Sequence, residues 1–237
     1  MSVGIRKSSM PLATKLRIFA IVAVLLAILS TGLWWWLRGW RPSPTQYPDQ
    51  GVTLSAETGE INWHALVKRG AGFAYIHATT GAAMRDPAFA RNWIDVRSAG
   101  LRYGAVLVYD PCRAAGDQAT LFITTVPRDN AALPPVVQFG GAAMCAGGPP
   151  PRDRILSELN TLINLVEAHS GKPALVRLSQ DFEERYQISG GINRTLWLER
   201  DFLPPDYAAR PWVMWTANHG RRVTGMDRPI EWDVVAP

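Results

Sequence analysis

The stretch Leu133-Pro134-Pro135-Val136-Val137-Gln138-Phe139-Gly140 decides how the rest of the chain is interpreted. Residues 136–139, apolar except for Gln138, predict a short buried β-strand. Side chains on a strand alternate between its two faces, so positions 138 and 140 project from the same face. In a closed barrel that face is the interior, near the opening. Both positions therefore lie where a barrel would carry its chemistry, and neither is acidic.

On both sides of this stretch, short apolar runs alternate with helical patterns. The expected strands are residues 51–54, 73–77, 103–109, 174–178, 196–199 and 213–216. The expected helices are residues 63–69, 87–99, 117–126 and 153–169. Strands that alternate with helices predict a parallel sheet, and their number suits a barrel. The last third has short connections and little helix, so the expected α/β fold is an irregular TIM-like (β/α) barrel with a β-rich second half.

Residues 18–37 (IFAIVAVLLAILSTGLWWWL) contain no charged side chain. As a helix they would be about 30 Å long, which matches the hydrocarbon core of a bilayer. Four cationic residues precede them, so the N-terminus is expected in the cytoplasm and the rest outside it, as in a single-pass protein of the plasma membrane. A cleaved signal peptide is the alternative, but its apolar stretch is usually shorter and ends in small residues. The expected organisation is a basic tail (1–17), a transmembrane anchor (18–37), a linker (38–48) and a barrel domain (49–237).

The net charge of +5 belongs to the N-terminus. Six basic residues and no acidic ones lie within residues 1–41, which leaves 19 basic and 20 acidic residues in the rest of the chain. That balance gives no support for a nucleic-acid partner. The four histidines, at positions 64, 77, 169 and 219, lack metal-ligand spacing. No phosphate-binding loop is present, and no cofactor is expected.

Several segments, taken in order, resemble glycoside hydrolase family 25, the muramidase-type lysozymes. They are GEINW (59–63), FAYIHATTG (73–81), DPAFARNW (86–93), AGLRYGA (99–105), LPPV (133–136), PWVMW (211–215) and PIE (229–231). No single segment is specific, but the ordered set extends from about residue 47 to residue 235. The resemblance implies a β/α-barrel with a peptidoglycan site at the carboxyl ends of its strands.

The departures from this family fall where its acids stand. Thr53 takes the place of the Asp in "G-I-D-V-S", and Gln138 and Gly140 take the places of both acids in "P-V-x-D-x-E". Thr80 replaces the Glu of "A-T-E-G", and only the last-strand acid persists, as Glu231. Glycoside cleavage needs a proton donor and a second carboxylate. Loss of the general acid alone costs roughly 10²–10⁴ in rate, and loss of the negative charges costs more.

Other residues remain candidates for the site. Asp110 and Glu231 are possible surrogate acids, and Glu57 is a third acid in the first loop. Sugar-binding candidates are Tyr109, Gln138, Trp215, Glu231 and His77. A buried, hydrogen-bonded imidazole is favoured for His77 over a catalytic base, and Trp215 is equally well explained as ordinary core.

Cys112 follows the third of these strands and Cys145 follows the fourth. Neighbouring parallel strands bring such loops together at one end of a barrel, and an exported domain meets an oxidising compartment. We therefore expect a disulfide between them. It would brace the opening of the groove.

Three functions fit these observations. The leading hypothesis is a membrane-anchored, lysozyme-like domain of the cell envelope that binds peptidoglycan, with hydrolysis lost or very weak. The second is an active N-acetylmuramidase that uses relocated acids, Asp110 and Glu231. The third is a scaffold that binds another envelope protein.

Overall fold

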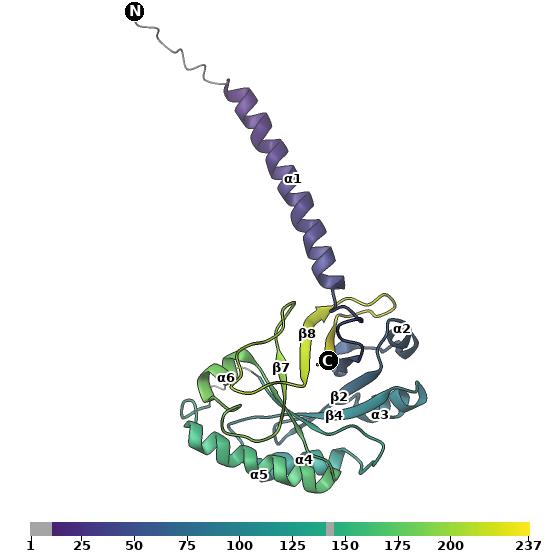
Figure 1. The fold of residues 1–237 in the computed structure, drawn as a ribbon, viewed down its shortest axis with the longest axis vertical. Helices are drawn as coiled ribbons and strands as arrows, with labels where there is room; N and C mark the ends of the chain where they lie inside the picture. Colours follow the sequence, from purple (N-terminus) through teal and green to yellow (C-terminus); the bar gives the residue numbers. More distant parts are fainter. Residues whose placement is uncertain (1–10, 141–144) are drawn as a thin grey trace, which may run out of the picture. The chain divides into compact units, whose positions relative to one another are not determined.

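The computed structural model describes residues 11–140 and 145–237, and the chain divides into the units Met1–Gly39 and Trp40–Pro237. The first unit contains the helix α1 (Leu12–Gly39), drawn in purple in Figure 1. It is the one described helix that is long and apolar enough to cross a membrane, a test that a signal sequence also passes. The predicted apolar segment 18–37 lies within it. Arg6 and Lys7 of the predicted basic tail lie outside the described residues.

The second unit is built on eight strands that close into a barrel. They are β1 (Gln50–Leu54), β2 (Phe73–Thr80), β4 (Arg102–Val108), β5 (Val136–Phe139), β6 (Leu175–Leu178), β7 (Thr195–Glu199), β8 (Met214–Arg221) and β9 (Ile230–Val235). Because β1 pairs with both β2 and β9, the sheet has no free edge along the barrel. The short β3 (Met84–Arg85) extends β2 as a hairpin.

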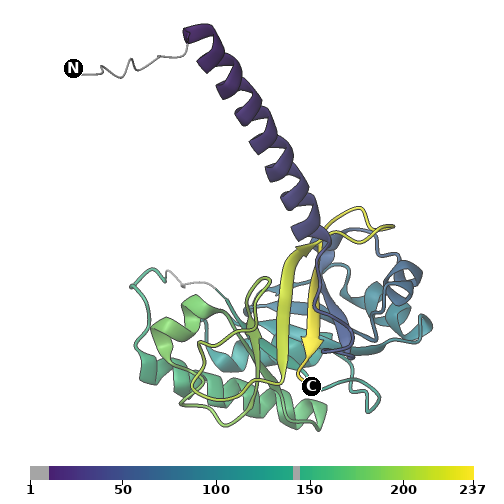
Figure 2. The ribbon, with the colours of Figure 1, turned by 45° about the horizontal axis from the view of Figure 1, so that its top comes forward.

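The alternation of strands and helices predicted a parallel sheet, but the barrel is not wholly parallel. Each barrel strand from β1 to β8 runs parallel to the barrel strand beside it. The last strand, β9, runs antiparallel to both β8 and β1. Only residues 222–229 connect β8 to β9, and so short a connection can join antiparallel strands but not parallel ones. Figure 2 shows these last two strands side by side in yellow.

Helices cover the outside of the first two thirds of the barrel (Figure 1). They are α2 (Trp63–Lys68), α3 (Phe89–Ser98), α4 (Ala115–Thr125), α5 (Arg152–Ser170) and α6 (Gln180–Tyr186). The apolar faces predicted for α3 and α5 are buried. The unpredicted α6 is capped by Ser179, whose side chain accepts a hydrogen bond from the Phe182 amide. The described residues 200–213, between β7 and β8, form no helix. The expectation of a mixed α/β barrel with an N-terminal apolar helix is confirmed, but a helix does not accompany every strand.

The interior of the barrel is packed, not hollow. An apolar cluster fills its amino-terminal part, separate from the larger core between strands and helices. Its buried members are Phe73, Tyr75, Val106, Val136, Leu175, Trp197 and Met214. Gly51 and Gly104 make room for two of the rings, since a Cβ at either position would lie 2.3 Å from an atom of Phe73 or Tyr75, respectively. Polar chemistry is therefore confined to the carboxyl ends of the strands.

The segment before β1 packs against the barrel wall. The Trp40 ring lies edge-on to Phe202, with centroids 5.5 Å apart, and Asn218 donates a hydrogen bond to the Trp40 carbonyl. Pro42 is buried, and its carbonyl accepts a hydrogen bond from the Gln50 amide. The compact unit therefore begins at Trp40, within the stretch expected to be a linker.

Candidate functional site

A pocket of about 640 Å³ opens at the carboxyl ends of β1 and β2 and at the start of β9. We call it the carboxyl-end pocket. Among the predicted site residues, Thr53, His77 and Glu231 line it, together with Thr80 and the exposed Glu57. The pairing of β1 with β9 thus brings Thr53 and Glu231, the first and last of the family acid positions, into one cavity.

A buried arginine lies beneath this pocket. Arg177 follows Leu175 by two residues on β6, so its side chain projects into the barrel just above the apolar cluster. Its side chain has no exposed surface. Nε lies 2.5 Å from Oε1 of Glu199, and Nη2 lies 2.8 Å from Oε2 of Glu231. The guanidinium therefore joins β6 to β7 and β9 through two ion pairs.

Charge pairing keeps this cluster ionised despite its burial. Burial disfavours the charged form of Arg177, but the carboxylates of Glu231 and Glu199 outweigh it and raise the pKa of Arg177 above its ordinary value. Burial likewise opposes ionisation of Glu199, yet Arg177 and His219 lower the pKa of Glu199 to about 2. Removing one member of such a buried pair leaves an uncompensated charge, which typically costs about 3–5 kcal/mol.

Thr53 occupies the first family acid position and is buried. Its hydroxyl donates a 2.8 Å hydrogen bond to Oδ2 of Asp233, whose Oδ1 accepts one from Thr216. Nη1 of Arg177 lies 3.4 Å from the Thr53 oxygen. Asp233 has no exposed surface, and burial raises its pKa to about 7. It can hold a proton near neutral pH, but it lies below the pocket and does not line it.

Gln138 and Gly140 occupy the other two acid positions. The Gln138 amide nitrogen donates to Oε1 of Glu199 at 3.3 Å, the oxygen that also accepts from Arg177. Its own Oε1 is buried and has no hydrogen-bond partner among the described residues. Gly140 is exposed, and a Cβ there would meet nothing within 4 Å. Neither position supplies a titratable group.

Two histidines lie at the pocket. His77 is at an irregularity in the pairing of β2 with β4, the kind of bulge that redirects a side chain. Burial lowers the pKa of His77, so its imidazole is neutral at pH 7. The exposed His219 places Nδ1 2.9 Å from Oδ1 of Asp201 and Nε2 3.7 Å from Oε2 of Glu199. Although partial burial works against it, these two carboxylates raise the pKa of His219 to about 10.

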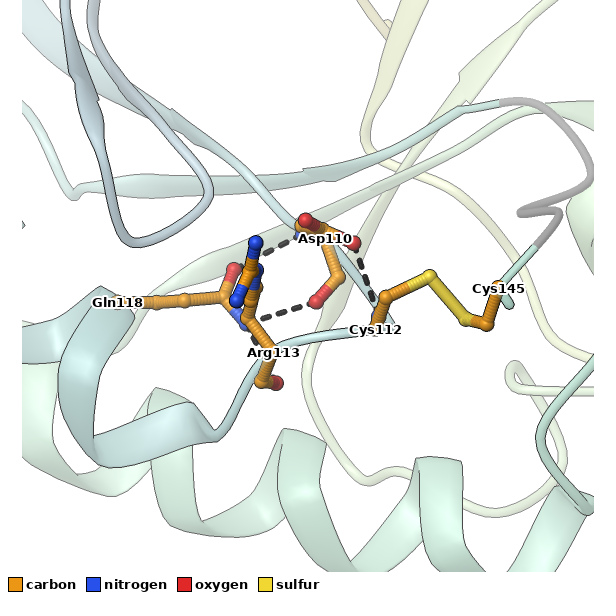
Figure 3. The surroundings of a disulfide bond; sticks show 5 residues. All are labelled: Asp110, Cys112, Arg113, Gln118 and Cys145. Carbon is orange, nitrogen blue, oxygen red and sulfur yellow. Dashed lines mark hydrogen bonds between the residues drawn. A yellow bond between two sulfur atoms is a disulfide. The ribbon is translucent and has the colours of Figure 1, made fainter. Parts of the chain in front are cut away.

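Asp110, one of the two predicted surrogate acids, stabilises a turn. Its carboxylate accepts a 2.9 Å hydrogen bond from the Cys112 amide, and its backbone is held by Gln118 (Figure 3). It does not line the carboxyl-end pocket. Cys112 and Cys145 form the predicted disulfide, which links the loops after β4 and β5. That expectation is confirmed.

The two aromatic candidates are buried. Trp215 is 1 % exposed, and its ring lies between Tyr47 and Trp212, so no ring face is free for a sugar. Tyr109 is 4 % exposed and packs its ring on Phe139. Neither residue lines the carboxyl-end pocket.

Sequence reasoning missed Arg177, Glu199 and Asp233. A signal was present in each case, because each of these charged residues is two positions from an apolar residue of the barrel interior, namely Leu175, Trp197 and Val235, and so faces inward. A charge at an inward position must find a partner in the barrel. Among the described residues, no group of three or more His, Cys, Asp or Glu side chains is arranged to hold a metal ion.

The family model "Glycosyl hydrolases family 25" matches residues 52–225, most of the barrel unit. The chain belongs to glycosyl hydrolases family 25. The resemblance inferred from the ordered segments is thereby confirmed. The solved structure of a family 25 glycosyl hydrolase from Bacillus anthracis is similar, with a TM-score of 0.76 and 27% identity over 84% of this chain and 92% of that one.

Further similar proteins extend the comparison. The chain is 27% identical to the uncharacterized protein YegX of Escherichia coli K12 over 198 residues, which is 81% of this chain and 71% of YegX. Lysozyme M1 of Streptomyces globisporus is 35% identical over 105 residues, 41% of this chain and 36% of that protein. A family GH25 lysozyme from Aspergillus fumigatus shares the fold, with a TM-score of 0.68, 19% identity and coverage of 80% and 94%.

Proposed function

We propose that this family 25 chain binds peptidoglycan glycan strands in the carboxyl-end pocket without cleaving them. One observation carries the proposal. Thr53, Gln138 and Gly140 bear no carboxyl group, and the remaining family acid, Glu231, is paired with Arg177. The family and its lysozyme members point to peptidoglycan as the ligand.

The chemistry supports binding over hydrolysis. Cleavage requires one carboxyl group to protonate the leaving oxygen and a second to act as base or nucleophile. Asp110 lies in a turn and Asp233 lies beneath the pocket, so neither is positioned for these roles. Of the two further acids that line the pocket, Asp86 accepts backbone hydrogen bonds with both carboxylate oxygens, and the exposed Glu57 supplies one carboxyl group where the reaction needs two. The exposed Thr80 and the imidazole of His77, both of which line the pocket, offer hydrogen-bonding groups of the kind that recognise sugar hydroxyl and amide groups.

Sedimentation with purified peptidoglycan sacculi tests this proposal. The full chain in detergent should sediment with sacculi and release no soluble muropeptides above a buffer control. Thr80 is exposed and lines the pocket, so T80W should block the pocket and weaken binding at least tenfold. I94W is the matched control, because Ile94 is 64 % exposed on α3 and outside the pocket. Robust muropeptide release by the wild type, or undiminished binding by T80W, would contradict the proposal.

We also propose that α1 anchors the chain in the plasma membrane, with the N-terminus cytoplasmic and the barrel outside. The helix is uncharged over residues 18–37, and cationic residues precede that stretch. Alkaline extraction of membranes should leave the chain in the pellet, and protease added from outside should degrade the barrel. A mature N-terminus that begins after residue 30 would instead show a cleaved signal sequence.

A further inference from the structure

Arg177 contacts two of the family acid positions, Thr53 and Glu231, and shares a partner with a third, Gln138. Its guanidinium pairs with Glu231, lies 3.4 Å from the Thr53 hydroxyl, and shares the Glu199 carboxylate with Gln138. The register explains this, because Gln138 on β5 is directly opposite Arg177 on β6, and Arg177 is opposite Trp197 on β7. One buried cation thus touches or shares a partner with residues from β1, β5, β7 and β9.

A fixed cation at this place opposes glycoside cleavage. In hydrolysis the glycosidic C–O bond breaks and a water oxygen bonds to the anomeric carbon. One carboxyl group gives its proton to the leaving oxygen, and one carboxylate takes a proton from the water. The sugar carbon becomes positively charged on the way, so nearby negative charge helps and nearby positive charge hinders. Arg177 is such a positive charge, and it neutralises the two carboxylates closest to it, those of Glu199 and Glu231.

We propose that Arg177 is a positioning residue that holds the pocket in a non-hydrolytic state, pairing with Glu199 and Glu231 so that these carboxylates cannot stabilise a cationic sugar. This inference rests on the proposed function, in that it explains why the pocket would bind and not cut. It also makes a claim of its own. Acids restored at positions 53, 138 and 140 are insufficient while a cation remains at position 177.

Three variants of the full chain in detergent test this claim. The first, the restored variant, carries T53D, Q138D and G140E. The second adds R177M and E199Q, which remove the cation and the Glu199 carboxylate together and leave Glu231 without its cationic partner. The third adds R177K alone to the restored variant and so retains a cation. Muropeptide release from sacculi is measured for each, alongside thermal unfolding and sedimentation with sacculi.

The restored variant and its R177K form should release muropeptides at rates within about tenfold of the buffer control. The variant with R177M and E199Q should release them at least 10²-fold faster, as expected if a proton donor and its charge partner begin to act. A purely structural role for Arg177 would not separate R177K from R177M in this way. Equal muropeptide release by the restored variant and by the folded variant that lacks Arg177 would overturn the inference. This holds whether both variants are active or both are inactive.

A second measurement keeps the inference testable if the multiple variants do not fold. Wild type and R177M/E199Q are titrated with N-acetylglucosamine and with a cationic iminosugar analogue, which mimics the charge of the reacting sugar. Removal of Arg177 should improve binding of the cationic analogue at least tenfold relative to the neutral sugar, because Glu231 is then unpaired. An unchanged ratio would refute the role of Arg177. Loss of sacculus binding by the wild type would instead refute the proposed function and leave this ratio as a separate result.

Discussion

The hydroxyl of Thr53 donates a 2.8 Å hydrogen bond to Oδ2 of Asp233, and this contact joins the first and last strands of the barrel. Thr53 thus places a neutral hydrogen-bond donor where the family has the carboxylate of an Asp. It also leaves Asp233 fully buried beside Glu231, with Arg177 as the nearby cation. The barrel therefore closes around a carboxyl group that is costly to ionise.

The first prediction concerns stability against pH. The pKa of Asp233 rises from an ordinary value of 3.8 to about 7 on folding, chiefly through burial. The folded state therefore holds a proton that the unfolded state releases between these values, so the contribution of Asp233 to stability falls as pH rises from about 4 to 7 and is level above that. Between pH 5 and pH 7.5, the ionisation of Asp233 should lower the free energy of unfolding by about 3 kcal/mol.

Chemical denaturation of the wild type and of Asp233→Asn at both pH values measures it. The wild type should lose more free energy of unfolding than the variant, since both retain the same histidines and other acids. Parallel losses in the two proteins would show that Asp233 does not carry the effect.

The second prediction compares two glycines on the barrel. Gly140→Ala should change the free energy of unfolding by less than about 0.5 kcal/mol, because its Cβ meets nothing within 4 Å. Gly51→Ala should cost about 1–3 kcal/mol or more, because its Cβ would lie 2.3 Å from the Phe73 ring. Denaturant titration distinguishes them, and similar costs at the two sites would contradict the packed barrel interior.

The third prediction concerns the disulfide between Cys112 and Cys145, which closes a loop of 33 residues in sequence separation. Replacing both cysteines with serine should destabilise the barrel by about 3 kcal/mol, because the unfolded chain gains freedom. Thiol labelling of the denatured wild type should find no reactive thiol without reductant and two with it. Cys112→Ser provides the control, since it should expose one thiol without reductant.

The fourth prediction concerns the start of the barrel unit. Trp40→Ala should lower the free energy of unfolding of the barrel by about 1–3 kcal/mol, because the half-buried ring packs against Phe202 and Trp215. Trp35→Ala is the matched control, since Trp35 lies in α1 and is 64 % exposed. If the two substitutions shift the denaturation midpoint equally, Trp40 does not belong to the folded wall.

Much of the fold could be predicted because its signals are local. The apolar stripe of residues 155–166 and the buried strand at residues 136–139 depend on periodicity and short range, and both match the structure. The seven-residue helix α6 was not predicted, although its N-cap residue Ser179 is a sequence signal for the start of a helix. The antiparallel course of β9 was not predicted because residues 230–235 were not among the expected strands, although the short connection of residues 222–229 permits only antiparallel pairing with β8.

The candidate site was predicted less completely. Thr53, His77 and Glu231 line one pocket, and their part in binding or chemistry stays a prediction. Trp215 and Tyr109 are buried in the core, because an aromatic side chain near a strand end is equally suited to packing between layers. Burial depends on neighbours from the whole barrel, so residue type alone could not show whether Trp215 and Tyr109 are buried or exposed.

By itself, the sequence determined the family, the apolar N-terminal helix and the absence of acids at positions 53, 138 and 140, because each is a matter of residue identity and order. Only the tertiary structure decided what takes the place of those acids. Closing β1 against β9 brings Arg177 to Thr53 and Glu231, which are 124 and 54 residues away along the chain. Such pairing is set by the register of a closed sheet, since a charge buried inside a barrel must find its counter-charge on a strand across the interior.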